Sequence, residues 1–341
     1  MKPPRNEPTR ILVTGGAGFI GSAYVRALLC GPQADSVTIT VLDRLTYAGN
    51  QANLAAVREH PGFAFAHGDI CDTELVDELA ATHDHMVHFA AESHVDRSIQ
   101  DATDFVRTNV LGTQTLLAAA VRRGVGRFVH VSTDEVYGSI AEGSWPETAP
   151  VQPNSPYAAS KAASDLVALA YHRTHGLDVR VTRASNTYGP HQYPEKIIPR
   201  FVTSLLQGRK VPLYGDGRHV RDWLHVDDHV LGVELVRRDG RPGEVYNIGG
   251  GNELTNRELT DLLLAACDAG WEMVSHVADR KGHDLRYAVD CSKVCGELGY
   301  RPRHDFRDGL AATVSWYRDN RDWWAPSVSQ GRPEAAPCGG W

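Results

Sequence analysis

The sequence predicts an α/β protein with a doubly wound parallel sheet and a smaller, discontinuous C-terminal substrate lobe. Short runs rich in Val, Ile and Phe alternate with amphipathic stretches of helical length through the first half of the chain. A glycine-rich turn lies directly between the first such run and the first helical stretch. This repetition is typical of a parallel sheet covered by helices on both faces, and the turn favours the Rossmann type of that fold.

Each expected strand of the first half ends in small or polar residues. These strands are 11–15, 37–43, 63–69, 85–91, 127–133 and 178–185, with helices expected at 20–29, 73–81, 105–122 and 160–175. Beyond residue 186 the segments become rich in Pro, Gly and Tyr, and a strand at 245–250 and a helix at 256–269 follow. The predicted division is a domain from 1–185 and about 218–245, a lobe from about 186–217 and 246–325, and a mobile tail at 327–341.

Composition excludes several classes of function. The 341 residues include 35 Lys and Arg against 42 Asp and Glu, and the resulting net charge of −7 is a poor match to nucleic acid. Six Cys without pairs at metal or redox spacing indicate reduced thiols. The N-terminal segment lacks the apolar core of a signal peptide, and no apolar run approaches the ~20 residues of a transmembrane helix. We therefore expect a cytoplasmic protein without a nucleic-acid or membrane partner.

The glycine-rich turn predicts a dinucleotide site. Gly15 permits the tight turn, Gly18 lets the backbone approach a pyrophosphate, and Gly21 lets the helix pack closely on the sheet. The phosphates would lie at the helix N-terminus, where free N–H groups and the helix dipole favour anions. A glycine-rich loop that serves packing alone is the alternative.

Acidic residues after the next two strands point to the adenosine half of the cofactor. Asp43 closes the second strand at the position where a carboxylate binds the adenosine ribose, which favours NAD over NADP. The adjacent Arg44 leaves NADP open, because a guanidinium can hold a 2′-phosphate. Asp69 and Ile70 follow the third strand and are placed to flank the adenine, although a surface turn also explains Asp69.

A Tyr and a Lys four residues apart predict redox chemistry. Ser155 and Pro156 form a helix start, so Tyr157 and Lys161 share one face of the helix. A Lys ammonium near a phenol favours the phenolate, which would lower the pKa of the tyrosine and let it take a proton from a sugar hydroxyl. This spacing is common on solvated helices, but together with the glycine turn it is the signature of short-chain dehydrogenases/reductases.

Two consecutive carboxylates follow the fifth strand. Thr133, Asp134 and Glu135 stand where the strand breaks, which would let both acids reach one substrate. Oxidation alone does not need two carboxylates, whereas elimination of water needs a base for a carbon-bound proton and an acid for the departing hydroxyl. A solvated acidic turn is the alternative.

The chain strongly resembles the dTDP-glucose 4,6-dehydratases, which belong to the extended short-chain dehydrogenase/reductase family. The match covers all but the termini. It is carried by TGGAGFIGS, HFAAESHVDRS, the Thr133-Asp134-Glu135 run, PYAASK, SNTYGPHQYPEKIIP, PLYGDGRHVRDWLHVDDH, DRKGHDLRYAVD and WYRDNRDWW. Thr187 is a departure, because the family usually has a second Asn after Asn186.

The resemblance implies a role for each matched residue. Tyr157 would deprotonate O4 of the glucosyl unit as hydride passes from C4 to NAD, with Thr133 bound to O4 and Lys161 at the nicotinamide ribose. Glu135 would take the C5 proton while Asp134 protonates the C6 hydroxyl, and hydride would then return to C6, so the tightly bound NAD is regenerated in each turnover. Further cofactor contacts would be Phe19, Ile20 and Ala90; substrate contacts would be Ser93, His94, Asn186, Glu195, Lys196, Pro212, Tyr214, Arg221, Asn256, Arg280 and His283.

Several alternatives remain at this point. The same scaffold serves other nucleotide-sugar 4,6-dehydratases, 4-epimerases and UDP-glucuronate decarboxylases, and a non-catalytic nucleotide-sugar or NAD-binding protein is a remote possibility. No metal site is expected, because the histidine clusters at 83–88 and 225–229 lack the spacing for converging ligands. The helices 105–122 and 160–175 are apolar on more than one face, which favours a homodimer through a helix bundle, with internal packing as the alternative.

Overall fold

A seven-stranded parallel sheet forms the centre of the larger domain. The computed structural model describes residues 7–280 and 282–329. The strands of this sheet are β1 (Thr9–Thr14), β2 (Val37–Asp43), β3 (Phe63–His67), β4 (His85–His88), β5 (Arg127–Thr133), β6 (Val179–Ala184) and β10 (Val245–Ile248). Their spatial order is β10-β6-β5-β4-β1-β2-β3, and every neighbouring pair is parallel. The predicted doubly wound fold is confirmed.

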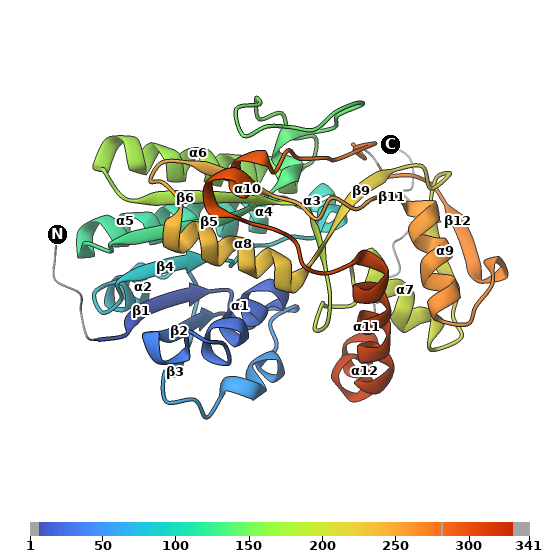
Figure 1. Ribbon diagram of the computed structural model, residues 1–341, viewed down its shortest axis with the longest axis horizontal. Coiled ribbons are helices and arrows are strands. Elements are labelled where there is room, and N and C mark those ends of the chain that lie inside the picture. Colours follow the sequence, from blue (N-terminus) through green and yellow to red (C-terminus); the bar gives the residue numbers. More distant parts are fainter. Residues whose placement is uncertain (1–6, 281, 330–341) are drawn as a thin grey trace.

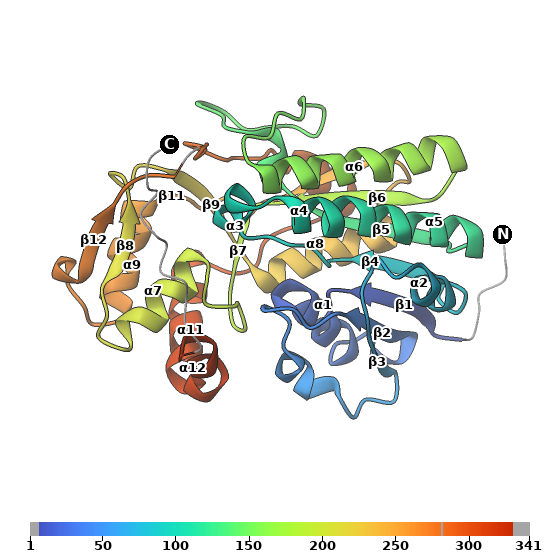
Figure 2. The ribbon, with the colours of Figure 1, turned by 180° about the vertical axis from the view of Figure 1, so that it is seen from behind.

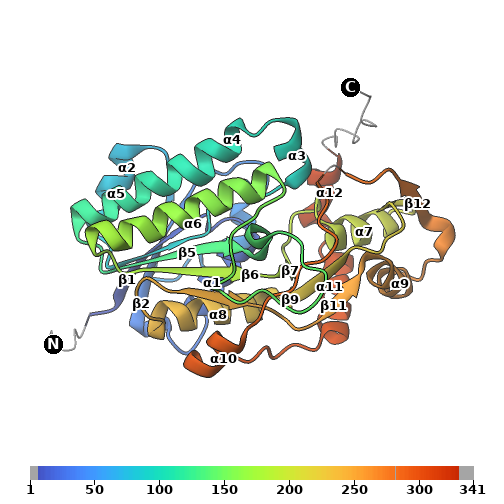
Figure 3. The same cartoon turned by 90° about the horizontal axis from the view of Figure 1, so that it is seen from above.

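Helices cover both faces of this sheet, as Figure 3 shows. One face carries α2 (Thr73–Ala80), α3 (Val95–Gln100), α4 (Thr103–Phe105), α5 (Thr113–Arg123) and α6 (Pro156–His175), and the other carries α1 (Phe19–Leu29), α8 (Val226–Asp239) and α10 (Ser292–Leu298). Short helical turns are η1 (Ala34–Ser36), η2 (Gln51–Val57), the π-helical η3 (Val106–Gly112), η4 (Asp134–Tyr137) and η5 (Trp271–Met273). Two apolar clusters fill the two sides of the sheet.

The smaller lobe lies at one end of the large sheet (Figures 1 and 2). It contains a three-stranded sheet of β7 (Asn186–Tyr188), β9 (Val220–His225) and β11 (Glu253–Thr255), and a two-stranded sheet of β8 (Val211–Tyr214) and β12 (Val274–Val277). Its helices are α7 (Ile197–Leu205), α9 (Asn256–Ala266), α11 (Phe306–Asp319) and α12 (Arg321–Ser329). A third apolar cluster forms its core and includes the buried Trp324.

The observed boundaries differ from the predicted division at two strands and one helix. α10 packs against α8 and β10 of the large domain, whereas the prediction placed it in the lobe. β9 lies in the small lobe and pairs with β7 and β11, whereas the prediction placed it in the larger domain. β10 pairs with β6 at the edge of the large sheet, whereas the prediction placed most of it in the lobe. Both strands are short, and long-range pairing rather than local pattern selects the sheet that each one joins. α12 extends to Ser329; the rest of the predicted tail, 330–341, lies outside the described residues.

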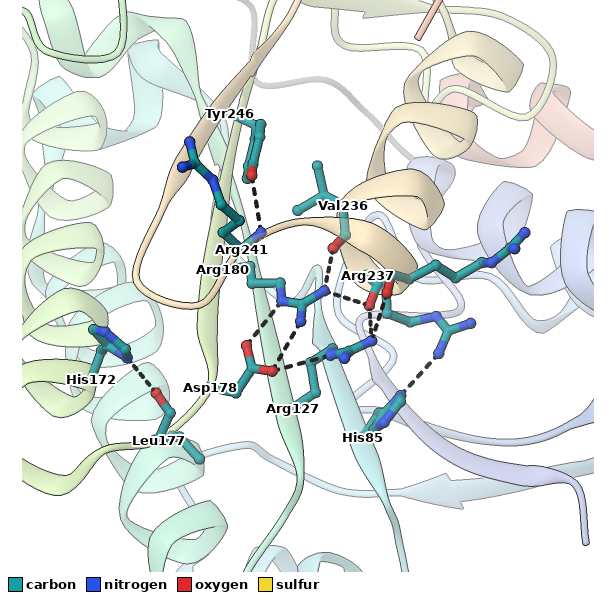
Figure 4. Close-up of polar contacts among 11 residues, drawn as sticks. His85, Arg127, His172, Leu177, Asp178, Arg180, Val236, Arg237, Arg241 and Tyr246 are labelled. Atoms are coloured by element: carbon teal, nitrogen blue, oxygen red, sulfur yellow. Dashed lines mark hydrogen bonds and ion pairs between the residues drawn. The ribbon is translucent and has the colours of Figure 1, made fainter. Parts of the chain in front are cut away.

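Arginines fasten the C-terminal end of α8 to the large sheet (Figure 4). The buried Arg180 donates from Nη1 to the carbonyls of Val236 at 2.8 Å and Arg237 at 2.9 Å, and Arg127 also donates to the Arg237 carbonyl. Asp178 accepts from Arg180 Nε at 2.9 Å. Because cations satisfy the free carbonyls and the negative dipole of a helix end, these contacts fix the C-terminal end of α8 to the large sheet.

None of the helices within the described residues is both long and apolar enough to span a bilayer.

Candidate active site

One cavity of about 430 Å³ lies between the carboxyl ends of the large sheet's strands and the small lobe. This is the edge at which open α/β sheets bind ligands. All of the residues predicted for the cofactor, the chemistry and the substrate line it. They are Gly15, Gly18, Phe19, Ile20, Gly21, Asp43, Asp69, Ile70, Ala90, Ser93, His94, Thr133, Asp134, Glu135, Tyr157, Lys161, Asn186, Glu195, Lys196, Pro212, Tyr214, Arg221, Asn256, Arg280 and His283.

The glycine turn leaves room for a pyrophosphate. Gly15 has φ +71°, and a Cβ there would lie 2.5 Å from the backbone N of Ala90. A Cβ on Gly21 would lie 2.3 Å from the Gly15 carbonyl oxygen, so the helix contacts the turn directly. α1 begins after Gly18 without a side-chain cap from any described residue, which leaves the first N–H groups of the helix available to an anion.

The loop after β2 is built around Asp43. Its Oδ2 accepts a hydrogen bond from the N–H of Ala17 at 2.9 Å and its Oδ1 accepts one from Leu45 at 2.8 Å, while burial raises the pKa of the carboxyl. A carboxylate has further lone pairs for ribose hydroxyls. Arg44 is the cation that could have held the 2′-phosphate of NADP. Its Nη1 lies 2.9 Å from Asp69 Oδ2, so this guanidinium is paired with a carboxylate of the protein. These residues fit the diphosphate and adenosine ribose of NAD.

The end of β5 presents two carboxyls to the same space. Thr133 ends the strand, and its hydroxyl caps η4 by accepting from the N–H of Glu135 at 3.3 Å. The short 3₁₀ turn breaks the alternation of the strand, so Asp134 and Glu135 both line the cavity. The Thr133 hydroxyl also donates to Asp134 Oδ1 at 3.2 Å.

The two carboxyls have different electrostatic surroundings. Burial raises the pKa of Asp134 well above its ordinary range, and the charges of Glu135 and Asp222 raise it further. Burial also raises the pKa of Glu135, but Lys196, Arg221 and Arg280 oppose that rise. Asp134 Oδ2 is buried and has no hydrogen-bond partner among residues 7–280 and 282–329. Asp134 is thus suited to act as an acid and Glu135 as a base.

α6 carries the Tyr–Lys pair. Ser155 accepts from the N–H of Ala158 at 3.1 Å with Pro156 in the first turn, which confirms the predicted helix start. Burial raises the pKa of Tyr157, and Glu135 and Asp134 raise it further, so the expected lowering by Lys161 is wrong for the protein without ligands. The Lys161 ammonium instead donates to the Val131 carbonyl at 2.8 Å, and burial lowers its pKa to about 8.

The small lobe supplies the predicted sugar contacts. Lys196 Nζ donates to the carbonyl of Ser93 at 2.6 Å, and His94 Nε2 lies 3.9 Å from Glu195 Oε2. Asn186 Oδ1 is buried and makes no hydrogen bond with the described part of the chain, so a substrate hydroxyl can use it. The hydroxyl of Thr187, where the family usually has Asn, lies 2.9 Å from His229 Nδ1.

Two arginines that line the cavity are held by protein contacts. Arg221 donates from Nη2 to the Asp284 carbonyl at 2.9 Å and lies 4.4 Å above the Tyr287 ring. Arg280 Nη1 lies 3.4 Å from Asp96 Oδ1, and its guanidinium is 5.0 Å above the ring of Tyr214. Guanidinium groups fixed in this way offer directed donors to a diphosphate.

The remaining predicted contacts lie at the edge of the small lobe. Asn256 begins α9 directly after the N-cap Thr255, whose capping box is completed by Glu258. Pro212 and Tyr214 belong to β8. His283 Nδ1 lies 2.6 Å from Asp279 Oδ1, and the His283 ring stacks on His219 at 3.6 Å between centroids.

Sequence reasoning assigned no role to Tyr287, Asp284 or Tyr47. The Tyr287 hydroxyl donates to the carboxylate of Asp284, and both residues line the cavity. They lie in the DRKGHDLRYAVD stretch, which is brought to the site by an isolated bridge between Val220 and Arg286. No local pattern indicates that pairing. Tyr47 contacts Glu195 from the opposite lobe and could be found only from the fold.

The histidine clusters set aside from the sequence have protein partners. His85 Nδ1 lies 2.9 Å from Arg237 Nη1, and His88 Nδ1 lies 2.7 Å from the Thr14 hydroxyl. Within the described residues, two groups bring His and Asp ligand atoms within 4.8 Å of one another: His219, Asp279 and His283, and His225, Asp227 and His304. In both groups the histidine rings stack in parallel, an arrangement in which their nitrogen lone pairs do not converge.

Comparison with known proteins identifies the family. The family model described as GDP-mannose 4,6 dehydratase matches residues 12–313. A dTDP-glucose 4,6-dehydratase of Streptomyces antibioticus is 66% identical over 330 residues, 96% of this chain and 98% of the relative. The crystal structure of DesIV, a dTDP-glucose 4,6-dehydratase of Streptomyces venezuelae with NAD bound, has a TM-score of 0.92 and 63% identity, over 94% of this chain and 100% of that one.

An epimerase is also similar, at a greater distance. The UDP-glucose 4-epimerase of Thermotoga maritima has a TM-score of 0.85 and 32% identity, covering 92% of this chain and 100% of that one. The scaffold is therefore shared, and the sequence is much closer to the dehydratases. The chain belongs to the family of dTDP-glucose 4,6-dehydratases.

Proposed function

We propose that the protein is an NAD-dependent dTDP-glucose 4,6-dehydratase that forms dTDP-4-keto-6-deoxyglucose. The observation that carries this is that Asp134, Glu135 and Tyr157 line one cavity. A 4-epimerase or a UDP-glucuronate decarboxylase oxidises C4 but has no need of an acid and a base for elimination of water. The identity of the sugar nucleotide is supported by the relatives.

The first step is removal of a proton from O4 of the sugar. Tyr157 accepts this proton, and the Thr133 hydroxyl, which ends β5 beside it, holds O4 in place. Lys161 lines the same wall and binds the ribose next to the reacting ring. NAD, when bound along the glycine turn, supplies the hydride acceptor at C4 and later the hydride donor at C6. The raised pKa of the buried Tyr157 keeps its phenol protonated before ligands bind, so the phenol has to lose this proton to solvent before it can accept the O4 proton. The positive charges of the Lys161 ammonium and of bound NAD would favour that ionisation.

The second step is elimination of water across C5 and C6. Oxidation at C4 makes the C5 proton acidic, and Glu135, surrounded by Lys196, Arg221 and Arg280, is the base that takes it. Asp134, whose pKa is raised, gives its proton to the departing C6 hydroxyl. After hydride returns to C6, Glu135 gives a proton back to C5.

The experiment is product analysis with the purified protein. Incubation with dTDP-glucose in deuterated water, without added NADH, is expected to give dTDP-4-keto-6-deoxyglucose with deuterium at C5. Tyr157→Phe should lose this activity. Tyr171→Phe, which removes a hydroxyl on the same helix that accepts a hydrogen bond from Gln114 Nε2, should keep it. A panel of dTDP-, UDP-, CDP- and GDP-glucose tests the nucleotide. Failure with all four would overturn the proposal.

The assembly is proposed to be a homodimer through a helix bundle formed by η3, α5 and α6. Val106, Leu111 and Leu166 are each more than half exposed there, which is unusual for side chains of this size. A charge placed among them, as in Leu166→Glu, should convert the dimer to a monomer in sedimentation velocity. A wild-type monomer would contradict this.

The cytoplasm is the proposed location. The five described cysteines are all free thiols, as expected in a reducing compartment. Cell fractionation tests the location, and recovery of the native protein outside the cytoplasmic fraction would contradict it.

A further inference from the structure

The loop 44–50, here called the strap, forms part of the wall of the cofactor half. At its start, Asp43 Oδ2 accepts from the N–H of Ala17 at 2.9 Å. At its end, the N–H of Asn50 donates to the carbonyl of Ala17 at 3.0 Å. Both ends of the strap are therefore fixed to the glycine turn. The strap residues that line the cavity are Arg44, Thr46, Ala48 and Gly49.

Tyr47, between these lining residues, reaches across to the small lobe. Its hydroxyl donates to Glu195 Oε1 at 3.1 Å. Glu195 lines the cavity beside Lys196 and is itself a predicted sugar contact. Tyr47 therefore holds the side chain of a residue that is expected to bind the sugar. Burial and the charge of Glu195 raise the pKa of the Tyr47 phenol, so it stays protonated and continues to donate.

Arg97 of α3 contacts both members of the Tyr47–Glu195 pair. Its guanidinium lies 3.7 Å above the centre of the Tyr47 ring, and its Nη2 lies 4.0 Å from Glu195 Oε2. The Tyr193 ring packs edge-on against Tyr47 at 5.5 Å between centroids. One tyrosine thus joins the strap after β2, helix α3 and the loop before α7.

The strap's backbone conformation depends on such contacts. Leu45, at the start of the strap, has φ +54°, the left-handed region that is unfavourable for a leucine. A segment that stores strain of this kind keeps its conformation only where its surroundings hold it. Loss of the Tyr47 hydroxyl contact should therefore loosen the strap rather than leave it in place.

We infer that Tyr47 is a latch that fastens the strap over bound NAD to Glu195 of the sugar lobe. Release of the cofactor then requires this bond between the lobes to break, and Glu195 is aimed at the sugar by the same bond. The inference rests on the proposed function for the identity of the two ligands. It makes Tyr47 a positioning residue that links cofactor retention to the sugar site, which suits an enzyme that regenerates NAD in each turnover.

The test measures how fast NAD leaves. Protein loaded with radiolabelled NAD is diluted into excess unlabelled NAD, and the bound label is followed by rapid filtration. Tyr47→Phe should release NAD about 10-fold faster than the wild type, because a hydrogen bond to a charged group is lost. In a Glu195→Gln background the same substitution should change the rate less than about 3-fold, since the charged acceptor is already absent.

Tyr24→Phe is the matched control. Tyr24 is fully buried and its hydroxyl donates to Glu234 Oε2 at 2.8 Å, so the variant loses the same kind of bond between α1 and α8. It should lower the melting temperature and leave the NAD release rate unchanged. Equal release from Tyr47→Phe and wild type, or equally faster release from both variants, would overturn the latch. Faster release from Tyr47→Phe alone supports the latch even if the wild type fails to dehydrate dTDP-glucose.

Discussion

Asp134→Asn should make the protein more stable near neutral pH and almost inactive. Asp134 is 2% exposed, and its pKa is raised by burial, by Glu135 and by Asp222. Because its pKa is higher in the folded protein, Asp134 contributes stability that is present below its ordinary pKa and is lost as pH rises through the folded value. Asparagine has a similar shape and takes up no proton, so the free energy of unfolding of the variant does not fall with rising pH on account of residue 134.

The magnitude follows from linkage. While the folded carboxyl is protonated and the unfolded one is ionised, the free energy of unfolding falls by about 1.4 kcal/mol per pH unit. Between about pH 5 and pH 7 the variant should therefore gain up to about 2.7 kcal/mol relative to the wild type. Urea unfolding at several pH values measures this difference.

Activity should change in the opposite direction. Asparagine cannot donate a proton to the leaving hydroxyl, and loss of a general acid costs about 10²- to 10⁴-fold in rate. That corresponds to about 2.7 to 5.4 kcal/mol of transition-state free energy. Single-turnover formation of the 4-keto-6-deoxy product measures it, and binding of dTDP-glucose should change little.

Asp77→Asn is the control for the stability measurement. Arg123 and Arg122 lower the pKa of this partly exposed carboxyl, so it is ionised in both folded and unfolded protein above about pH 5. Its difference from the wild type should stay constant over the same range. If Asp134→Asn showed the same flat profile, Asp134 would be ionised in the resting enzyme and its role as the acid would be wrong.

Three further outcomes are expected. Glu135→Gln should leave oxidation at C4 measurable as absorbance of the reduced cofactor while blocking elimination, and normal dehydration by this variant would remove Glu135 as the base. Burial lowers the pKa of Lys161 to about 8, so kcat/KM should fall as pH rises through about 8. If the pH profile of Lys161→Met showed the same fall above about pH 8, another group would be responsible for it. Gly15→Ala should cost about 1 to 3 kcal/mol of stability and abolish NAD binding in a titration, because its Cβ would lie 2.5 Å from Ala90 N. Gly124→Ala, also at positive φ but with open space around the added Cβ, should lose stability alone, and equal loss of NAD binding by both variants would contradict the steric argument.

Local signals predicted much of this site. Gly15 follows β1 and Asp43 ends β2, and both strands have a clear apolar pattern. Because the carboxyl ends of parallel strands meet at one edge of the sheet, the convergence of these two residues could be foreseen. The start of α6 could also be predicted from the sequence, because the Ser155 cap and the proline after it act within one turn of the helix.

Features that depend on long-range pairing could not be foreseen. The sheet that β10 joins is decided by pairing with β6, and the place of Tyr287 depends on a bridge far along the chain. The pKa of Tyr157 was expected to fall because its distance from Lys161 along the helix was known. The burial and the two neighbouring carboxyls that raise it come only from the fold.

We propose that oxidation, elimination and reduction take place in one cavity with one retained cofactor. The most direct test uses dTDP-glucose deuterated at C4, with the position of deuterium in the product read by NMR. Transfer of the deuterium to C6 of the 4-keto-6-deoxy product, without added NADH, is the predicted result. A product without deuterium at C6, or substrate recovered with inverted configuration at C4, would contradict the account.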